Sequence, residues 1–318
     1  MLNKNFSFIE APVYQGQSHY GVSLGPSFIR QMLLDQNYHF RSLLAQESQS
    51  KKKICPGIYE EVSYLVEREL RRRQLVFIAG GDHSLSIGSI QGLLRCHPNA
   101  KVLWVDAHGD VNTTQTSLTK SFHGMPLAFL LGLDPYFNES GWFDVHLKPE
   151  NLIYFGLRDL DEAEKQHLEQ LNIQHYSAKD IHENSIDEII QKIKCDVKDQ
   201  ILHLSIDADA FDPTLAPSTG VPVNDGLTFG TVEKLVKNLL DVAEVKSIEY
   251  VEVNPQIYNV VDDVFKTAQI GIDLFKLVLE KHKQQEVFHG FDDRFGDSKE
   301  PGLHDSDLKL EKQSQFTT

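Results

Sequence analysis

The chain has few cysteines and less positive than negative charge. Cys55, Cys96 and Cys195 are the three cysteines among 318 residues, and no two of them have C-x-x-C spacing. This argues against a disulfide scaffold and favours reduced thiols inside a cell. Lys and Arg number 31 against 46 Asp and Glu, so the formal net charge is −15. A general nucleic-acid or anionic-membrane binder is expected to carry a basic face, and this balance argues against both classes.

Long hydrophobic runs are also missing. No segment approaches the roughly 20 apolar residues of a membrane helix, and Met1–Glu10 lacks the apolar core of a signal peptide. We therefore expect a cytoplasmic protein with neither a membrane nor a nucleic acid as partner. The hydrophobic fraction of 41% and the charged fraction of 24% are ordinary for a globular protein. The acidic balance mildly favours a small cationic ligand.

Short apolar runs alternate with helical patterns over the whole chain. Leu75–Ala79, Lys101–Val105 and Ile201–Ile206 are examples of the apolar runs. Such alternation predicts an α/β fold with a mostly parallel sheet and helices on both faces. No repeat, composition break or linker is visible, so we expect one domain over residues 1–318, with a polar C-terminal tail from about residue 284.

Two polar segments are expected to lie outside the strands and helices. Residues 40–53 end in three lysines and are predicted to form a solvated loop. The final helix is predicted over Asp262–Lys281, and the polar residues after Lys283 are expected to form a loose tail or an oligomer contact.

Several predicted strands end in ionisable residues. Asp106, His108 and Asp110 follow the run Lys101–Val105 at every second position. Four more such residues follow other predicted strands: His83, Asp207, Asp209 and Glu252. The carboxyl ends of parallel strands meet at one edge of a sheet, where ligands bind in open α/β folds. Ionisable groups there are costly to desolvate unless something positive pairs with them.

These residue types fit two divalent cations. Four carboxylates balance the charge of two such ions, and with two imidazoles they form a harder donor set than the Cys/His set of structural zinc. This favours Mn²⁺, with Co²⁺ as an alternative because metal supply in the cell decides. Two ions about 3.5–4 Å apart are a recurring device for ionising water near neutral pH. Unrelated turn-capping residues would be the other interpretation, and the recurrence of the pattern argues against it.

Four sequence blocks resemble the ureohydrolases, the family of arginases, agmatinases and formiminoglutamases. The blocks are Gly80-Gly81-Asp82-His83-Ser84, Asp106-Ala107-His108-Gly109-Asp110, Ser205-Ile206-Asp207-Ala208-Asp209 and Glu252-Val253-Asn254-Pro255. They occur in the order of the family with similar separations, and the resemblance extends from about Gly21 through the last helix. It implies the three-layer α/β/α arginase fold, hydrolysis of a guanidino compound, and a homo-oligomer that is a trimer or a hexamer.

The resemblance also implies the ligands of two Mn²⁺ ions per chain. One ion would be held by His83, Asp106, Asp110 and Asp207. The other would be held by Asp106, His108, Asp207 and Asp209, so that Asp106 and Asp207 bridge the two ions.

Catalytic roles follow from the same resemblance. Glu252 is the natural partner of a guanidinium group, because carboxylate and guanidinium match through two parallel charge-assisted hydrogen bonds. His123 resembles the proton shuttle of the family, and imidazole suits proton transfer near neutral pH. Asp110 is predicted to be catalytic as well as a metal ligand.

The substrate is implied by three further positions. Asn112 and Thr119 resemble residues that contact the α-carboxylate of an amino acid, and Asp161 resembles the acid that faces its α-amino group. The resemblance is therefore closest to arginase, which hydrolyses L-arginine to L-ornithine and urea.

Three positions depart from the arginase pattern. Gly109 and Val221 replace threonines, and Met125 replaces a polar residue. The loss of a hydroxyl at Val221 leaves agmatinase, formiminoglutamase or guanidino-acid hydrolase activity as an alternative. A catalytically silent metal-binding regulator on the same fold is a second alternative. A deacetylase of the related fold is a third, although its single-zinc ligand pattern needs neither His83 nor Asp110.

Overall fold

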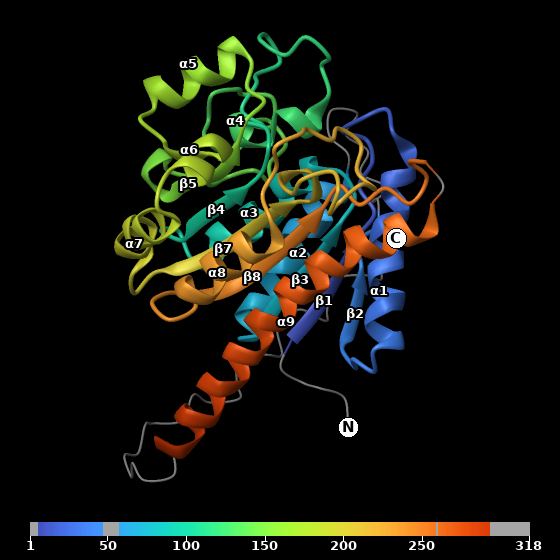
Figure 1. The fold of residues 1–318 in the computed structure, drawn as a ribbon, viewed down its shortest axis with the longest axis vertical. Coiled ribbons are helices and arrows are strands. Elements are labelled where there is room, and N and C mark those ends of the chain that lie inside the picture. The colour runs from blue at the N-terminus through green and yellow to red at the C-terminus, as the bar shows by residue number, and fades with distance from the viewer. Residues whose placement is uncertain (1–5, 47–56, 259, 293–318) are drawn as a thin grey trace, which may run out of the picture. The chain divides into compact units, whose positions relative to one another are not determined.

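The computed structural model describes residues 6–46, 57–258 and 260–292. The helices and strands of these residues follow in chain order as β1 (Phe6–Ala11), α1 (Gly25–Asp35), β2 (Arg41–Leu44), α2 (Gly57–Arg71), β3 (Leu75–Gly80), α3 (Ser86–Cys96), β4 (Lys101–Val105), α4 (Pro126–Leu130), β5 (Leu152–Leu157), α5 (Glu162–Gln170), β6 (Gln174–Ser177), α6 (Ala178–Glu183), α7 (Ile186–Val197), β7 (Ile201–Asp207), α8 (Phe229–Leu239), β8 (Glu244–Val251) and α9 (Val261–Asp292). In this part of the chain, eight strands form one sheet in the order β2-β1-β3-β8-β7-β4-β5-β6 (Figure 1). Every pair of neighbouring strands in it is parallel, which confirms the predicted α/β class.

Helices cover both faces of the sheet. Successive strand residues alternate between two apolar clusters, as Phe77 and Leu103 in one and Ile78 and Trp104 in the other show. Helices α1, α7, α8 and α9 contribute to the first cluster, and α2, α3 and α4 contribute to the second. Burial on both faces explains why the strands are nearly continuous apolar runs. The predicted three-layer α/β/α arrangement is confirmed.

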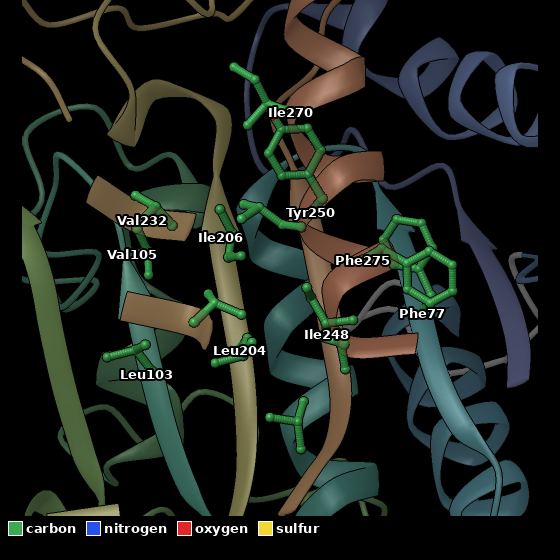
Figure 2. Packing of buried hydrophobic residues seen from close by; sticks show 14 of the residues in the cluster. Phe77, Leu103, Val105, Leu204, Ile206, Val232, Ile248, Tyr250, Ile270 and Phe275 are labelled. Carbon is green, nitrogen blue, oxygen red and sulfur yellow. The ribbon is translucent and has the colours of Figure 1, made fainter. Parts of the chain in front are cut away.

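The first cluster is densely packed with aromatic and branched side chains (Figure 2). Phe275 of α9 stacks on Phe77 of β3, with ring centroids 4.3 Å apart and ring planes at 11°. Ile248 and Tyr250 of β8 lie in the same cluster as Ile270 of α9. This packing fixes α9 against the central strands.

Strand β2 lies where the sequence predicts a polar loop. Arg41–Leu44 pairs in parallel with β1 at one edge of the sheet, with Arg41 opposite Ser7. Three of its four side chains are exposed. As an edge strand it has a single neighbouring strand in the sheet. The predicted loop over residues 40–53 is therefore wrong for 41–44, and residues 47–53 lie outside the described residues.

Helix α9 is longer than the predicted Asp262–Lys281 and continues to Asp292. Residues 280–286 are rich in Glu, Lys and Gln, which form helices readily without an apolar pattern. The chain divides into two compact units, Met1–Lys281 and His282–Thr318. The single domain over 1–318 with a tail from about residue 284 stays a prediction. Within the described residues, no helix combines the length and the apolar character that crossing a membrane requires.

Candidate metal centre and active site

The candidate site lies at the carboxyl ends of four neighbouring strands, β3, β8, β7 and β4. His83 opens the turn after β3, Asp106 follows β4, Asp207 ends β7 and Glu252 follows β8. The turn after β3 needs glycine, because a Cβ at Gly81 would lie 1.8 Å from the carbonyl oxygen of Val13. Because the strands are parallel and adjacent, residues far apart in sequence reach one place without long loops.

His83 faces three carboxylates. Its Nδ1 atom lies close to Asp106 Oδ2 (3.0 Å), Asp110 Oδ2 (3.1 Å) and Asp207 Oδ2 (3.0 Å). All four residues are buried. Among the described residues, Nδ1 has no partner with hydrogen-bond geometry. A buried imidazole nitrogen that converges with carboxylate oxygens in this way can serve as a ligand of one cation.

A second group of possible ligands adjoins the first. His108 Nδ1 lies 3.6 Å from Asp106 Oδ1 and 3.3 Å from Asp209 Oδ2. The ligand atoms of these three residues lie within 4.8 Å of one another. Asp106 therefore directs Oδ2 toward the first group and Oδ1 toward the second. The other oxygen of Asp207, Oδ1, accepts a hydrogen bond from the backbone N–H of Asp209 (2.8 Å), and bridging by Asp207 stays a prediction.

The charges of this cluster oppose one another. Burial and the charge of Asp106 raise the pKa of Asp110 to about 7. Burial, with the charges of Asp209 and Asp106, raises the pKa of Asp207 well above its usual range. Burial disfavours a charged His83, but contact with the surrounding carboxylates outweighs it and raises the pKa of His83 well above its usual value. The ionised forms of Asp110 and Asp207 are thus favoured by nearby positive charge, which divalent cations would supply.

The ring of His83 is fixed from behind. Its Nε2 lies 2.8 Å from Ser205 Oγ, and that hydroxyl donates to Glu249 Oε1 at 2.7 Å. Trp104 stacks on the imidazole, with centroids 4.0 Å apart and planes at 6°, and its Nε1 donates to Asp106 Oδ2 (2.9 Å). Because the Ser205 hydroxyl donates its proton to Glu249, its oxygen is left to accept the N–H at Nε2 of His83. Such outer contacts hold the tautomer and the orientation of a metal-ligating histidine.

Glu249 is the acid at the base of this chain of hydrogen bonds. It is buried, accepts a hydrogen bond from Ser86 Oγ (2.5 Å) and another from Ser89, and lies 3.3 Å from His203 Nε2. Burial opposes its ionisation, but the electrostatic attraction of His203, together with the hydrogen bond from Ser86, outweighs burial and lowers the pKa of Glu249 to about 2. Ser205 lies in one of the four sequence blocks but had no predicted role, and Glu249 was not predicted. Each of them is a polar residue inside a predicted buried strand. A buried polar group needs a hydrogen-bond partner, so this position in the sequence could have indicated a polar network.

Glu252 lies beside the first group of ligands. Its Oε1 accepts a hydrogen bond from the backbone N–H of His83 (3.0 Å), and both carboxylate oxygens accept from Gln17 Nε2 (2.8 and 2.7 Å). Burial and the charge of Asp82 raise the pKa of Glu252 to about 8. Its backbone φ is 65°, and that of Asp110 is 51°. Left-handed backbone at non-glycine residues is costly and occurs where the surrounding structure holds it, often at functional sites.

His123 approaches Glu252 from a different loop. Its Nδ1 lies 3.7 Å from Glu252 Oε1, and its backbone N–H donates to the carbonyl oxygen of Gly16 (3.2 Å). Burial lowers the pKa of His123 below its usual value. The neutral imidazole is thus favoured near neutral pH, and it can accept a proton there.

Two of the three predicted substrate-contacting residues lie together. Asn112 Nδ2 donates to Asp161 Oδ2 at 2.7 Å, and Asp161 Oδ1 accepts the backbone N–H of Glu164 as the N-cap of α5. Thr119 is exposed on the loop between β4 and α4, where its Oγ1 accepts a hydrogen bond from the backbone N–H of Ser121 (3.2 Å). The Asn112–Asp161 hydrogen bond fixes both side chains relative to α5.

The three departures from the arginase pattern differ in their surroundings. A Cβ at Gly109 would lie 2.9 Å from Leu160 and 3.0 Å from the carboxyl group of Glu164, so this position has little room for a side chain. Met125 is fully buried in the second apolar cluster, whereas Val221 is 40% exposed. Of the three, Val221 is the side chain with access to solvent.

Comparisons with known proteins match nearly the whole chain. The model of the arginase family matches residues 4–278. The arginase of Bacillus caldovelox is 31% identical over 292 residues, which covers 85% of this chain and 96% of that protein. The crystal structure of Bacillus subtilis arginase aligns with a TM-score of 0.76 and 30% identity over 86% of this chain and 98% of its own. Entamoeba histolytica arginase in complex with L-ornithine aligns with a TM-score of 0.77 and 26% identity over 87% and 98%.

These matches confirm the resemblance seen in the four sequence blocks, and with it the arginase-like fold and the class of enzyme. The chain belongs to the arginase family of ureohydrolases.

Proposed function

We propose that this hydrolase converts L-arginine to L-ornithine and urea with two Mn²⁺ ions. The observation that carries the proposal is the convergence of His83 Nδ1 with oxygens of Asp106, Asp110 and Asp207 within 3.1 Å. The buried carboxylate of Glu252, which suits a guanidinium group, accepts a hydrogen bond from the backbone N–H of His83. The proposed substrate site therefore lies next to the proposed metal centre.

The proposed ligands form two overlapping sets. His83, Asp106, Asp110 and Asp207 would hold one ion, and Asp106, His108, Asp207 and Asp209 would hold the other. Divalent cations held in this way supply hydroxide near neutral pH. The oxygen-rich donor set supports Mn²⁺, and Co²⁺ is the alternative.

Glu252 and His123 would act on the substrate directly. Charge delocalisation makes a guanidinium carbon a weak electrophile, so the group has to be well oriented for attack. The Glu252 carboxylate would hold the guanidinium group by two parallel hydrogen bonds. The leaving amine departs only after protonation. His123, whose Nδ1 is 3.7 Å from Glu252 Oε1, lies beside the proposed partner of the guanidinium group and would pass a proton to the leaving amine. Asp110 would contribute to catalysis as a ligand.

The far end of the substrate would meet Asn112, Thr119 and Asp161. Asn112 and Thr119 would contact the α-carboxylate, and Asp161 would face the α-amino group. The hydrogen bond between Asn112 and Asp161 supports this assignment because it holds two of the three side chains in fixed positions. Agmatine has no carboxylate, so these residues favour L-arginine. Val221 keeps agmatine, formiminoglutamate and guanidino acids as alternative substrates.

Other properties stay predictions. The proposed substrate is a small cationic guanidino compound, and no nucleic acid or membrane is expected as a partner. The proposed location is cytoplasmic, and the proposed assembly is a trimer or a hexamer.

The substrate assignment is tested by a panel of guanidino compounds. We expect the Mn²⁺-loaded protein to release urea from L-arginine with a kcat/KM at least about 100-fold higher than from agmatine or 4-guanidinobutyrate, because polar contacts to the amino-acid end are lost in those compounds. Formamide release from formiminoglutamate is measured alongside, and Co²⁺-loaded protein is run in parallel. A preference for agmatine would contradict the assignment, and two bound metal ions without any turnover would support the silent regulator.

The role of Glu252 is tested by Glu252→Ala. We expect kcat/KM to fall by about 100-fold or more, because a charge-assisted contact to the guanidinium is lost. Bound metal per chain, measured by elemental analysis, should not change because Glu252 belongs to neither ligand set. Glu244→Ala, at an exposed position of β8, is the matched control. Near-normal activity of Glu252→Ala would show that another group holds the guanidinium.

The contact behind His83 is tested by Ser205→Ala. We expect about 10–100-fold weaker Mn²⁺ binding in a calorimetric titration, because His83 loses the group that fixes its ring. Ser7→Ala serves as the control, since Ser7 is also buried and its hydroxyl donates to a carboxylate, that of Glu69. Equal Mn²⁺ affinity in Ser205→Ala and Ser7→Ala would refute the positioning role of Ser205.

A further inference from the structure

Gln17 lies on the loop after β1, and its amide makes an asymmetric set of contacts. The residue is 9% exposed. Its Nε2 donates to both carboxylate oxygens of Glu252, at 2.8 and 2.7 Å. Its Oε1 is buried and, in the part of the chain that the structure describes, has no hydrogen-bond partner. A buried amide oxygen without a donor is unfavourable, and an N–H donor of a bound ligand would satisfy it.

The position of Gln17 is fixed by its neighbour. The backbone N–H of Gly16 donates to Asp82 Oδ2 (2.8 Å), and its carbonyl oxygen accepts the backbone N–H of His123 (3.2 Å). A Cβ at Gly16 would lie 2.6 Å from Asp82 Oδ1, so glycine is required for this close approach. The loop is therefore attached to the turn of His83 and to the loop of His123, and the free oxygen of Gln17 has a defined position.

Gly220 marks the space that this oxygen shares with Glu252. A Cβ at Gly220 would lie 3.3 Å from Gln17 Oε1 and 3.9 Å from Glu252 Oε2. Glycine at this position thus leaves room beside two acceptor oxygens, one amide and one carboxylate. A guanidinium group is planar and carries several N–H donors, so it can donate to both acceptors at once.

We propose that Gln17 recognises the guanidinium group together with Glu252. Its Nε2 positions the Glu252 carboxylate, and its Oε1 accepts an N–H of the bound guanidinium in the space left by Gly220. This assignment rests on the proposed function, because it concerns the substrate end that is cleaved there.

The test compares Gln17→Met with Gln15→Met. Methionine keeps the length of the side chain and removes both the donor and the acceptor. Gln15 is exposed on the same loop, which makes it a matched control. We expect Gln17→Met to raise the KM for L-arginine by about 10–100-fold, as loss of hydrogen bonds to charged groups does. L-Ornithine has no guanidinium group, and its contacts at the amino-acid end remain in the variant. Its inhibition constant should therefore differ less than about threefold between Gln17→Met and the parent protein.

A second variant tests the shared space. Gly220→Ala places a methyl group 3.3 Å from Gln17 Oε1 and 3.9 Å from Glu252 Oε2, and it should also raise the KM for L-arginine while leaving L-ornithine inhibition and Mn²⁺ content as they are. Equal KM values in Gln17→Met and Gln15→Met would overturn the proposal. A parallel rise in the KM for L-arginine and the inhibition constant of L-ornithine would also overturn it, because it would indicate a general change of pocket shape. So would loss of Mn²⁺ from Gln17→Met.

Failure of the proposed function gives a different result. If the parent protein hydrolyses another guanidino compound, the proposed substrate is wrong, and KM for that compound is compared between the variants. If it hydrolyses none, the proposed function is wrong, and a calorimetric titration of Mn²⁺-loaded protein with guanidinium chloride still tests Gln17. Weaker binding to Gln17→Met than to Gln15→Met supports the inference, and equal binding contradicts it.

Discussion

The structure depends on how like charges are held together at the ends of four neighbouring strands. Three carboxylates meet one imidazole nitrogen within 3.1 Å, in a space that solvent hardly reaches. Burial and the charges of neighbouring carboxylates raise the pKa values of Asp110 and Asp207. Divalent ions would offset this cost, because each ion would stabilise the carboxylates around it. The negative charge of the cluster would then contribute to metal affinity.

The surrounding fold keeps this cluster in place. Both faces of the sheet are covered by apolar layers, so the strands that carry the ligands are packed on both sides. Behind His83 the layer is polar instead, with Ser205 and Glu249 in buried strands. Each of these polar groups is hydrogen-bonded, so the network adds orientation without leaving a buried charge alone. On the other side, Glu252 has a left-handed backbone, and its carboxylate lies next to Gln17 and His123.

Much of this arrangement could be predicted from sequence, because parallel strands make the geometry simple. Asp106, His108 and Asp110 directly follow a buried strand, and strands of one parallel sheet end at one edge. Strand β2 could not be found, since an edge strand with exposed side chains has no apolar alternation. The contact of Gln17 with Glu252 joins residues 235 positions apart. No local pattern carries such information, and an unpaired amide oxygen is visible only in three dimensions.

The central claim is that six side chains on neighbouring strand ends bind a pair of metal ions. Anomalous diffraction from crystals grown with excess Mn²⁺ tests it most directly. The account predicts two peaks per chain, one next to His83 Nδ1 and one next to His108 Nδ1, with Asp106 in contact with both. A single peak, or two peaks away from these side chains, would contradict it.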